Sequence, residues 1–442
     1  MGRSTFLGGI HPYEGKELTM DKPITELLPK GELVYPMSQH IGSNAKPIVA
    51  KGDQVLVGQK IGEADGFVSS NVISSVSGTV KAVEKRLTIT GEMVESVIIE
   101  NDNEYRTVDG FGKARDYNKL SKDQIREIIK EAGIVGMGGA GYPTHAKLTP
   151  EDDNKIEYVI INGAECEPYL TSDYRIMMEQ PEKVIEGLKI ILKLFDKAKG
   201  IIVIEDNKPK AIQKLQGLVA KEKNIEIKVA KTKYPQGGER QIVYVATGRK
   251  LNFSLHPADV GCIVNNVYTV TSIYNAVALN TPLITRIVTV TGDAIKEPGN
   301  YSVRLGTSYR DIIEGVGGFT SQPEKVISGG PMMGISMFSL DVPLTKLTAE
   351  ILAYRKDEAA VEEGPCIRCG KCVEVCPLKL LPNKLAMLAN HSDKEAFQKF
   401  YGMECCGCGA CSYICPARKN LTSVIMQTRA SIIEDMKKTE GN

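Results

Sequence analysis

Two runs of cysteine near the C-terminal end of the chain repeat the pattern C-x2-C-x2-C-x3-C-P. This spacing predicts two [4Fe-4S] clusters, because the first three thiolates of each run hold one cluster while the fourth crosses over to the other. The expected ligands of the first cluster are Cys366, Cys369, Cys372 and Cys415. Those of the second cluster are Cys405, Cys408, Cys411 and Cys376. The pattern therefore predicts one-electron chemistry.

Zinc binding is the alternative interpretation of these cysteines. Zinc sites favour two C-x2-C pairs separated by a longer loop, whereas here four close thiolates are followed by proline. The spacing therefore favours iron-sulfur clusters over zinc, and disulfides are expected even less than zinc. Cys406 lies outside the repeated pattern, and Cys166 and Cys262 are isolated in the sequence. We expect these three cysteines to be packing residues.

Composition limits the class of protein. The 442 residues are enough for several domains, and 55 basic against 54 acidic side chains leave a formal charge of +1. This balance does not indicate nucleic-acid binding. The N-terminus lacks the apolar core of a signal peptide, and no run approaches the roughly 18 apolar residues of a spanning helix. We expect a soluble chain without a transmembrane segment, in a reducing cytoplasm that suits free thiols.

The first of four expected domains is a barrel-sandwich β domain over residues 1–110. From about residue 35 to residue 100, short apolar runs alternate with glycine turns, which predicts short strands. The pattern resembles the fold of biotinyl and lipoyl domains, which carry a cofactor on a lysine at a hairpin tip. This chain has no lysine between Ile61 and Val80. We therefore expect a structural or docking role for the domain.

A Rossmann-like α/β domain is expected over residues 111–280. Ser121 and Gln124 form a possible capping box, which predicts the start of a helix. From residue 157 to residue 230, apolar runs of strand length alternate with amphipathic helical patterns. Such alternation is typical of a parallel sheet covered by helices.

The remaining two domains complete a multidomain α/β protein. Residues 281–348 contain two expected strands joined through a glycine- and proline-containing turn, then a short helix, a pattern that resembles a β-grasp domain of the SLBB type. A charged stretch at about 350–364 indicates a solvated linker or helix. Residues 349–442 then form the expected α-helical, ferredoxin-like domain with two clusters.

A second candidate site lies in the expected α/β domain, where the sequence GMGGAGYPTHAKL contains four glycines and a lysine. Closely spaced glycines allow backbone N–H groups to converge on an anion, and the lysine adds positive charge. The pattern matches neither the dinucleotide fingerprint nor the Walker sequence. A tight loop packed on a sheet is the alternative explanation. The residues concerned are Gly136, Gly138, Gly139, Gly141 and Lys147.

Three further segments carry polar residues where open α/β sheets bind ligands, at or near expected strand ends. Each segment alone has an ordinary explanation, such as a strand-end asparagine, a turn or an N-cap. Their occurrence together on a chain with eight cluster cysteines favours a ligand site. INGAECEPY contributes Asn162, Glu165 and Glu167; YPQGGERQ contributes Tyr234, Gly237, Gly238 and Glu239; VNNVYT contributes Asn265, Asn266 and Thr269.

In order and approximate spacing, these four segments are similar to the flavin-binding segments of the NADH-oxidising flavoprotein of respiratory complex I. The whole chain, from TFLGGIHPYEGKEL through the paired cysteine runs, resembles the C subunit of the Rnf complexes, a family that couples ferredoxin and NAD to ion transport. Two departures from complex I favour the Rnf family. Met137 stands where complex I has arginine, and a two-cluster domain replaces a single-cluster domain.

The resemblance implies roles for the candidate residues. The glycine loop and Lys147 would surround the phosphate and ring of FMN, and Glu167 would contact the nicotinamide ribose. No acid or base is required for hydride transfer, so no catalytic residue is expected. The other implied contacts are Asn162 and Glu165 on the ring or ribityl side, Asn265, Asn266 and Thr269 on the phosphate, and Tyr234 and Glu239 with Gly237 and Gly238 along the flavin face.

The resemblance also implies cofactors, partners and location. Electrons from reduced ferredoxin would arrive through other Rnf subunits, cross two [4Fe-4S] clusters and reach FMN, which exchanges hydride with NAD(H), while partner subunits move Na+ or H+. The chain would lie peripherally on the cytoplasmic face of the membrane. Two alternatives stay open: a soluble corrinoid reductase built from the same modules, and a non-enzymatic electron relay whose glycine loop is empty.

Overall fold

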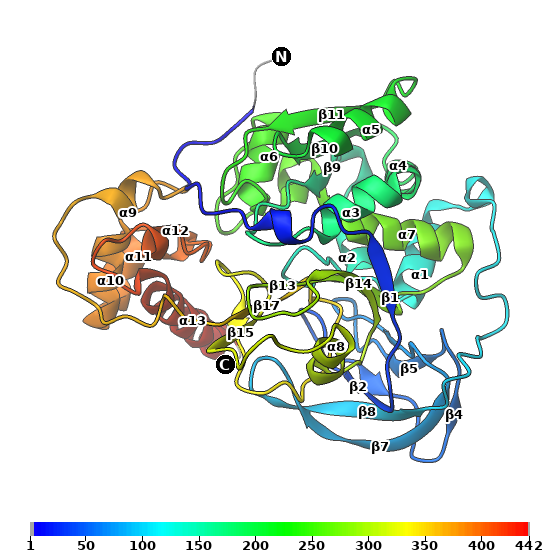
Figure 1. Cartoon of the computed structure of the whole chain (residues 1–442). Helices are drawn as coiled ribbons and strands as arrows, with labels where there is room; N and C mark the ends of the chain where they lie inside the picture. The colour runs from blue at the N-terminus through cyan, green and yellow to red at the C-terminus, as the bar shows by residue number, and fades with distance from the viewer. Residues whose placement is uncertain (1–3, 441–442) are drawn as a thin grey trace.

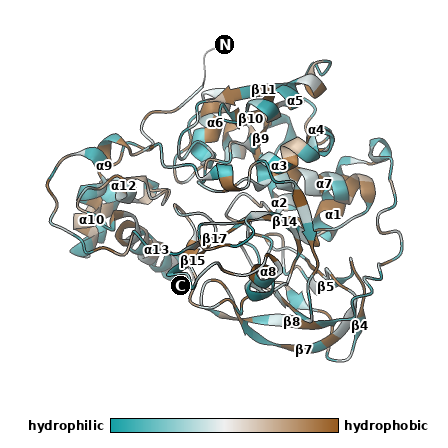
Figure 2. Ribbon diagram, viewed as in Figure 1, coloured by the Kyte–Doolittle hydropathy of each residue, from teal (hydrophilic) through white to brown (hydrophobic). Residues whose placement is uncertain are grey.

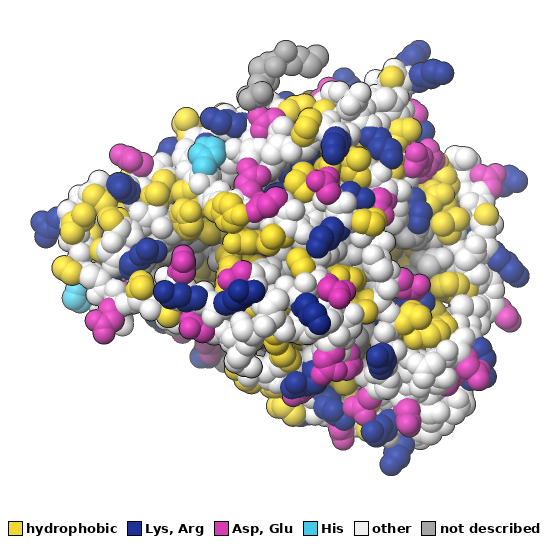
Figure 3. Space-filling view, in the orientation of Figure 1, with side chains coloured by type: hydrophobic (Ala, Val, Ile, Leu, Met, Phe, Trp, Pro, Cys, Tyr) yellow, Lys and Arg dark blue, Asp and Glu magenta, His cyan; other side chains and the backbone are white. Residues whose placement is uncertain are grey.

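The computed structural model describes residues 4–440, which form three sheet-containing parts and a helical part at one side (Figure 1). Basic and acidic side chains are interspersed over the face seen in Figure 3. Within residues 4–440 no helix combines the length and apolarity needed to cross a bilayer.

The N-terminal β part packs a four-stranded sheet and a three-stranded sheet around one apolar core. Leu33, Tyr35 and Ile61 are buried in this core, and the alternation along the strands places them inward. The larger sheet has the order β2 (Glu32–Pro36), β8 (Met93–Asn101), β7 (Gly78–Leu87) and β4 (Gln54–Val55). The smaller has the order β3 (Lys46–Pro47), β5 (Lys60–Glu63) and β6 (Val72–Ile73).

The central part is a parallel four-stranded sheet, as the alternation of strands and helices predicts. Successive residues of its inner strands face opposite sides, so Ile161 packs with α4 and α7 while Ile160 packs with α6. Figure 2 shows apolar residues along these strands. The strand order is β11 (Ile225–Ala230), β10 (Lys199–Glu205), β9 (Tyr158–Gly163) and β12 (Cys262–Asn266). The helices are α1 (Lys122–Glu131), α2 (Thr144–Lys147), α3 (Ser172–Glu179), α4 (Pro181–Leu192), α5 (Pro209–Val219), α6 (Glu239–Thr247) and α7 (Val267–Leu279).

The strand order contains a reversal that matters for ligand binding. The chain adds β10 and β11 on one side of β9 and then crosses back to place β12 on the other side. In open α/β sheets such a reversal opens a crevice beyond the carboxyl ends of the two strands, where ligands bind. The predicted capping box is confirmed at the start of α1, where Ser121 and Gln124 exchange side chain and backbone hydrogen bonds.

The third sheet-containing part is a six-stranded mixed sheet that lies between the other parts and carries helix α8 (Tyr309–Gly315) (Figure 1). One of its edge strands comes from the N-terminal region: Ile24 to Leu27 pair in parallel with residues 300–303. The sheet order is β1 (Ile24–Leu27), β14 (Gly299–Arg304), β13 (Thr285–Thr291), β17 (Glu350–Tyr354), β15 (Lys325–Ser328) and β16 (Ile335–Ser336). The expectation of a solvated linker or helix from about residue 350 is wrong for residues 350–354, because they form the buried strand β17 between two other strands.

The C-terminal part is helical and contains both cysteine runs. Gly370 and Gly409 have almost the same left-handed backbone conformation, with φ 80° and 78°, and each precedes a four-residue helix. The two runs therefore repeat in structure as well as in sequence, and glycine is favoured at these two positions. The helices are α9 (Lys371–Glu374), α10 (Pro382–Asn390), α11 (Lys394–Lys399), α12 (Ala410–Tyr413) and α13 (Leu421–Glu440).

Alanine substitutions at two helical glycines test the packing of the central part. A Cβ at Gly187 of α4 would lie 2.3 Å from the Val270 carbonyl oxygen of α7, whereas a Cβ at Gly217 of α5 would meet nothing within 4 Å. We expect Gly187→Ala to lower the free energy of unfolding by about 1–3 kcal/mol through overpacking. Gly217→Ala should raise it by about 0.5–1 kcal/mol through helix propensity. Urea unfolding followed by circular dichroism measures both, and equal effects would contradict the close α4–α7 contact.

Candidate flavin and iron-sulfur sites

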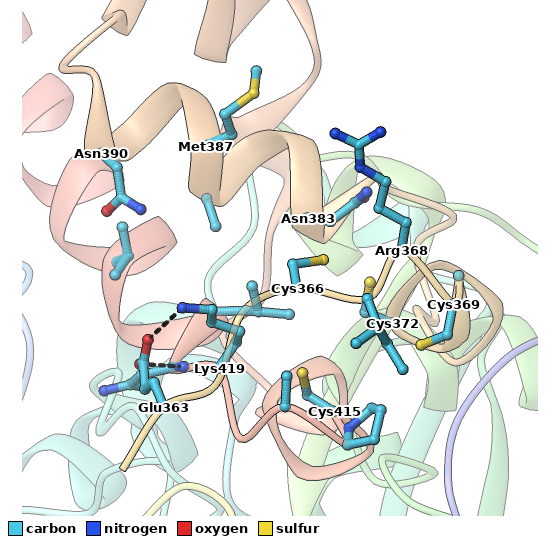
Figure 4. A pocket seen from close by; sticks show the side chains of 18 of the residues that line it. Glu363, Cys366, Arg368, Cys369, Cys372, Asn383, Met387, Asn390, Cys415 and Lys419 are labelled. Carbon is cyan, nitrogen blue, oxygen red and sulfur yellow. Dashed lines mark hydrogen bonds and ion pairs between the residues drawn. The ribbon is translucent and has the colours of Figure 1, made fainter.

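The eight cysteines of the two runs line two separate cavities in the helical part. The first cavity is lined by Cys366, Cys369 and Cys372 of one run and by Cys415 of the other, and Figure 4 shows their side chains around a common space. Each cavity thus combines three thiols from one run with the last thiol of the other. Within residues 4–440 no three His, Cys, Asp or Glu side chains are placed to hold a single metal ion. The second cavity is lined by Cys376, Cys405, Cys408 and Cys411, and also by Cys406.

The two sets differ in exposure. Cys366 and Cys369 of the first set are exposed, whereas the second set consists of buried and half-buried thiols. Burial raises the pKa of Cys376, and it raises the pKa of Cys405 to about 12. Without a positive partner these thiols would stay protonated, and iron provides such a partner because cluster ligation requires thiolates. The donor set and its surroundings therefore fit a bound cluster.

The second set lies against the central part of the molecule. Tyr234 is buried, and its hydroxyl donates a hydrogen bond to the carbonyl oxygen of Cys408 at 2.7 Å. Burial holds the pKa of Tyr234 far above its ordinary value, so the phenol stays a neutral donor. Arg240 of α6 adds an ion pair to Glu404 at 2.8 Å. The cysteine domain is thus fixed to the segment that follows β11.

The glycine loop runs between α1 and α2 and lies over the start of α7. The N–H of Met137 donates to the Thr269 hydroxyl at 2.9 Å, and a Cβ at Gly138 would lie 3.1 Å from the Cβ of Asn266. Gly139 has φ 144° and would have nothing within 4 Å of a Cβ, so the loop is open at this point. A glycine is favoured there by conformation, and the open space leaves the backbone accessible to a ligand.

Polar side chains from three segments meet at the carboxyl ends of β9 and β12. Asn162 and Asn266 are partners in the parallel register of these strands. The Asn162 amide donates to the Gly237 carbonyl oxygen at 2.8 Å, which brings the YPQGGERQ segment to the same edge. The Lys147 amine donates to the Val264 carbonyl oxygen at 3.0 Å. A Cβ at Gly136 would lie 3.5 Å from the Nζ of Lys147, so the lysine lies beside the glycine loop.

The charge of Lys147 is poorly compensated. Burial lowers the pKa of Lys147, and the charge of Glu239 at the start of α6 only partly opposes this effect. An anion bound beside Lys147 would favour the protonated amine, since opposite charges raise the pKa of a buried lysine. The lysine therefore suits a phosphate.

Two glutamates singled out in the sequence have backbone partners. Glu165 Oε1 accepts hydrogen bonds from the backbone N–H groups of Asp173 and Tyr174 at 2.7 and 3.0 Å, at the first turn of α3. Glu167 Oε1 accepts from the N–H groups of Met332 and Met333 at 2.7 and 3.3 Å. Glu167 thereby links the central part to a loop of the six-stranded sheet.

Two buried amides have no hydrogen-bond partner among the described residues. Both amide atoms of Asn265 and both of Gln236 are unsatisfied, although the side chains are 1 % and 0 % exposed. Each such orphaned group costs about 1–3 kcal/mol, so these atoms fit a ligand that supplies complementary groups. Sequence reasoning singled out Asn265 but missed Gln236, whose only signal was its place between Tyr234 and Gly237.

The structure brings most of the candidate residues together. The glycine loop, Lys147, Thr269 and the strand-end asparagines form one continuous region, and the Gly237 carbonyl joins it through Asn162. Glu165 instead accepts a hydrogen bond from the first turn of α3. Glu167 and the Tyr234 hydroxyl make hydrogen bonds to neighbouring domains. The arrangement places an open glycine loop and unsatisfied amides in the part of the molecule that contacts the second set of thiols.

Three family descriptions match separate parts of the chain. Residues 4–104 match the RnfC barrel sandwich hybrid domain, residues 129–275 the Nuo51 FMN-binding domain, and residues 287–336 the SLBB domain. The barrel-sandwich, flavin-binding and SLBB-type folds expected from the sequence are therefore confirmed.

Curated relatives match over most of the chain. The C subunit of the Na(+)-translocating ferredoxin:NAD(+) oxidoreductase complex of Acetobacterium woodii is 43% identical over 98% of this chain and 98% of its own length. The proton-translocating counterpart of Clostridium ljungdahlii is 43% identical over 89% of this chain and 86% of its own. The C subunit of the ion-translocating oxidoreductase complex of Pectobacterium atrosepticum is 39% identical over 88% of this chain but only 56% of its own length.

A solved structure shares the fold at low sequence identity. A chain of the NAD+-reducing [NiFe]-hydrogenase in its H2-reduced state superimposes with a TM-score of 0.51 and 18% identity, over 70% of this chain and 63% of that chain.

The similarity to the two 43% identical relatives extends over nearly the full length of this chain and of theirs. The chain therefore belongs to the RnfC family, the C subunits of the ion-translocating ferredoxin:NAD(+) oxidoreductase complexes.

Proposed function

We propose that this protein passes electrons between two [4Fe-4S] clusters and FMN and exchanges hydride with NAD(H). It would do so at the cytoplasmic face of a membrane complex. Partner subunits of that complex would receive electrons from ferredoxin and move Na+ or H+. Bound FMN would supply the exchange between two-electron hydride chemistry and one-electron transfer. We propose that flavin and nicotinamide bind within residues 111–280 and both clusters within 349–442, whose helical part after β17 would be the ferredoxin-like domain. The relatives' names and the matched flavin-binding domain support this proposal.

The observation that carries the proposal is the contact between the two candidate sites. Orphaned amides and the glycine loop lie at the reversal of the parallel sheet, and the Tyr234 hydroxyl joins the segment beside Gly237 to the backbone of Cys408. Cys166, Met332 and Cys406 pack in the same apolar cluster as Tyr234. This apolar contact would exclude water between the flavin site and the second set of cysteines.

The chain's own groups would bind and orient the flavin. Lys147 and the N–H groups of Gly138 and Gly139 would face the phosphate, and the N-terminus of α7 adds its positive end through Asn266. The amides of Asn265 and Gln236 would donate to and accept from the ligand. The further proposed contacts are Gly136, Gly141, Asn162, Glu165, Tyr234, Gly237, Gly238, Glu239 and Thr269, with Glu167 toward the nicotinamide nucleotide.

Lys147 offers a direct test of flavin binding. The purified chain should bind FMN, and NADH should bleach its visible absorbance under anaerobic conditions. Lys147→Met should weaken FMN binding by roughly 10- to 150-fold, because a charge-assisted hydrogen bond contributes about 1.5–3 kcal/mol. Fluorescence quenching on titration with FMN measures the dissociation constant.

A matched control is Lys228→Met. Lys228 of β11 also donates to a backbone carbonyl, that of Ala246 at 2.9 Å, on the far side of the sheet from β12. Its replacement should leave FMN binding unchanged. A wild-type chain that binds no FMN, or equal affinities for both variants and wild type, would contradict the proposed flavin site.

The crossed arrangement of cysteines predicts the iron content of two variants. Cys415→Ala should lower the iron content from about eight to about four atoms per chain, because it removes one ligand of the first cluster only. Cys406→Ala should keep about eight, since Cys406 lies outside the repeated pattern. Iron analysis and EPR of the dithionite-reduced protein measure both. Zinc in place of iron, or loss of both clusters on Cys415→Ala alone, would contradict the assignment.

A further inference from the structure

The glycine loop of the flavin-binding domain is held by side chains from the neighbouring β-grasp domain. The chain segment that enters β17 carries Lys346 and Leu347, and strand β13 carries Arg286. These residues contact the beginning, the middle and the end of the loop. None of them was singled out in the sequence.

Arg286 holds the middle of the loop. Its side chain is buried, its Nη2 donates to the Met137 carbonyl oxygen at 2.9 Å, and its Nε donates to the Thr348 carbonyl oxygen at 3.0 Å. The guanidinium also lies over the Tyr268 ring, 4.8 Å from the centroid. Met137, which lies between Gly136 and Gly138, is thus held at its N–H by the Thr269 hydroxyl and at its carbonyl oxygen by Arg286.

Lys346 holds the beginning of the loop. This lysine is fully buried, and its Nζ donates to the carbonyl oxygens of Gly133 at 2.8 Å and Asn71 at 2.6 Å and to the Ser70 hydroxyl at 3.1 Å. Gly133 follows the C-cap of α1 and lies three residues before Gly136, and Ser70 and Asn71 belong to the barrel-sandwich domain. One buried amine therefore joins three domains at the beginning of the loop.

Leu347 holds the end of the loop. A Cβ at Gly141 would lie 2.8 Å from the Leu347 side chain and 3.3 Å from the Cα of His40. The N–H of Ile41 in the barrel-sandwich domain donates to the Gly141 carbonyl oxygen at 3.2 Å. The loop is thus enclosed at this end by both β domains, while the side near Gly139 stays open.

A loop with four glycines in six residues needs such external contacts. Glycine has more backbone freedom than any other residue, and a free loop would lose this freedom on binding a ligand. Contacts that already hold the backbone lower this entropic cost and so strengthen binding. Ordinary domain packing explains apolar contacts, but Arg286 and Lys346 direct hydrogen-bond donors at backbone carbonyl oxygens of the loop.

We propose that Arg286, Lys346 and Leu347 of the β-grasp domain are positioning residues, which hold the glycine loop in its ligand-binding conformation. The inference rests on the proposed binding of FMN at this loop. It gives the β-grasp domain a function in flavin binding, and it gives the barrel-sandwich domain a supporting one through Ser70 and Asn71.

Arg286→Lys tests the proposal while keeping the positive charge. A lysine amine cannot reproduce the separate Nε and Nη2 contacts to Thr348 and Met137. We expect FMN binding to weaken about tenfold, as for the loss of one hydrogen bond to a charged group. In the protein without FMN, amide hydrogen exchange of residues 134–143 should become faster, which a role in overall folding alone would not produce.

The matched control is Arg310→Lys, an exposed arginine of α8 in the same domain that pairs with Asp341. It should change neither the FMN affinity nor the amide hydrogen exchange of the loop.

Lys346→Met gives a second test. Its control is Lys325→Met, because Lys325 pairs with Asp357 away from the loop. Lys346→Met should speed exchange at residues 134–143 before global unfolding begins.

The outcomes separate this inference from the proposed function. If Arg286→Lys and Lys346→Met bind FMN like the wild type and show wild-type exchange in the loop, the positioning role is wrong while flavin binding stands. If the wild type binds no FMN, the proposed function fails. The exchange measurement then still decides whether the β-grasp residues hold the loop.

Discussion

The hydrogen bond from Tyr234 to the Cys408 carbonyl oxygen joins the two parts of the molecule in which the proposed electron transfer would take place. A flavin and a cluster on different domains can exchange electrons rapidly only if their separation is short and constant. Several independent contacts hold these two domains together. Arg240 pairs with Glu404, and Gly9 donates to Val375 from the N-terminal segment, which packs along both domains. The proposed site therefore depends on domain contacts as much as on its own residues.

Buried polar groups maintain this arrangement. Lys16 is buried and donates to the carbonyl oxygens of Glu165, Glu167 and Leu170, so it fixes the turn that follows β9 from outside. Burial, and after it the negative charge of Glu165, raises the pKa of Asp173 above its ordinary value. Such groups add little net stability because of their desolvation, but leaving one unpartnered is costly. They therefore specify one arrangement of the domains, which is what a fixed electron path requires.

Sequence patterns predicted the features that depend on short-range spacing. Cysteine spacing predicted the sets that line the two cavities, and the Ser121 capping box and the alternation after residue 157 predicted local structure correctly. Contacts between distant segments left no pattern. The pairing of β1 with β14, and the hydrogen bonds from Arg286 to Met137 and from Lys346 to Gly133, join residues more than a hundred positions apart. Gln236 looks like an ordinary turn residue until its burial is known.

We propose that the second set of cysteines lies between the flavin site and the first set, and following electron flow from the clusters to NAD+ tests this order. The chain, loaded with FMN and clusters, is reduced with dithionite, freed of excess reductant and mixed with NAD+, and EPR of rapidly frozen samples records each cluster. In the wild type both cluster signals should decay as NADH forms. In Cys376→Ala, which lacks a ligand of the second cluster, the first cluster should stay reduced. Reoxidation of the first cluster at the wild-type rate in that variant would contradict the account.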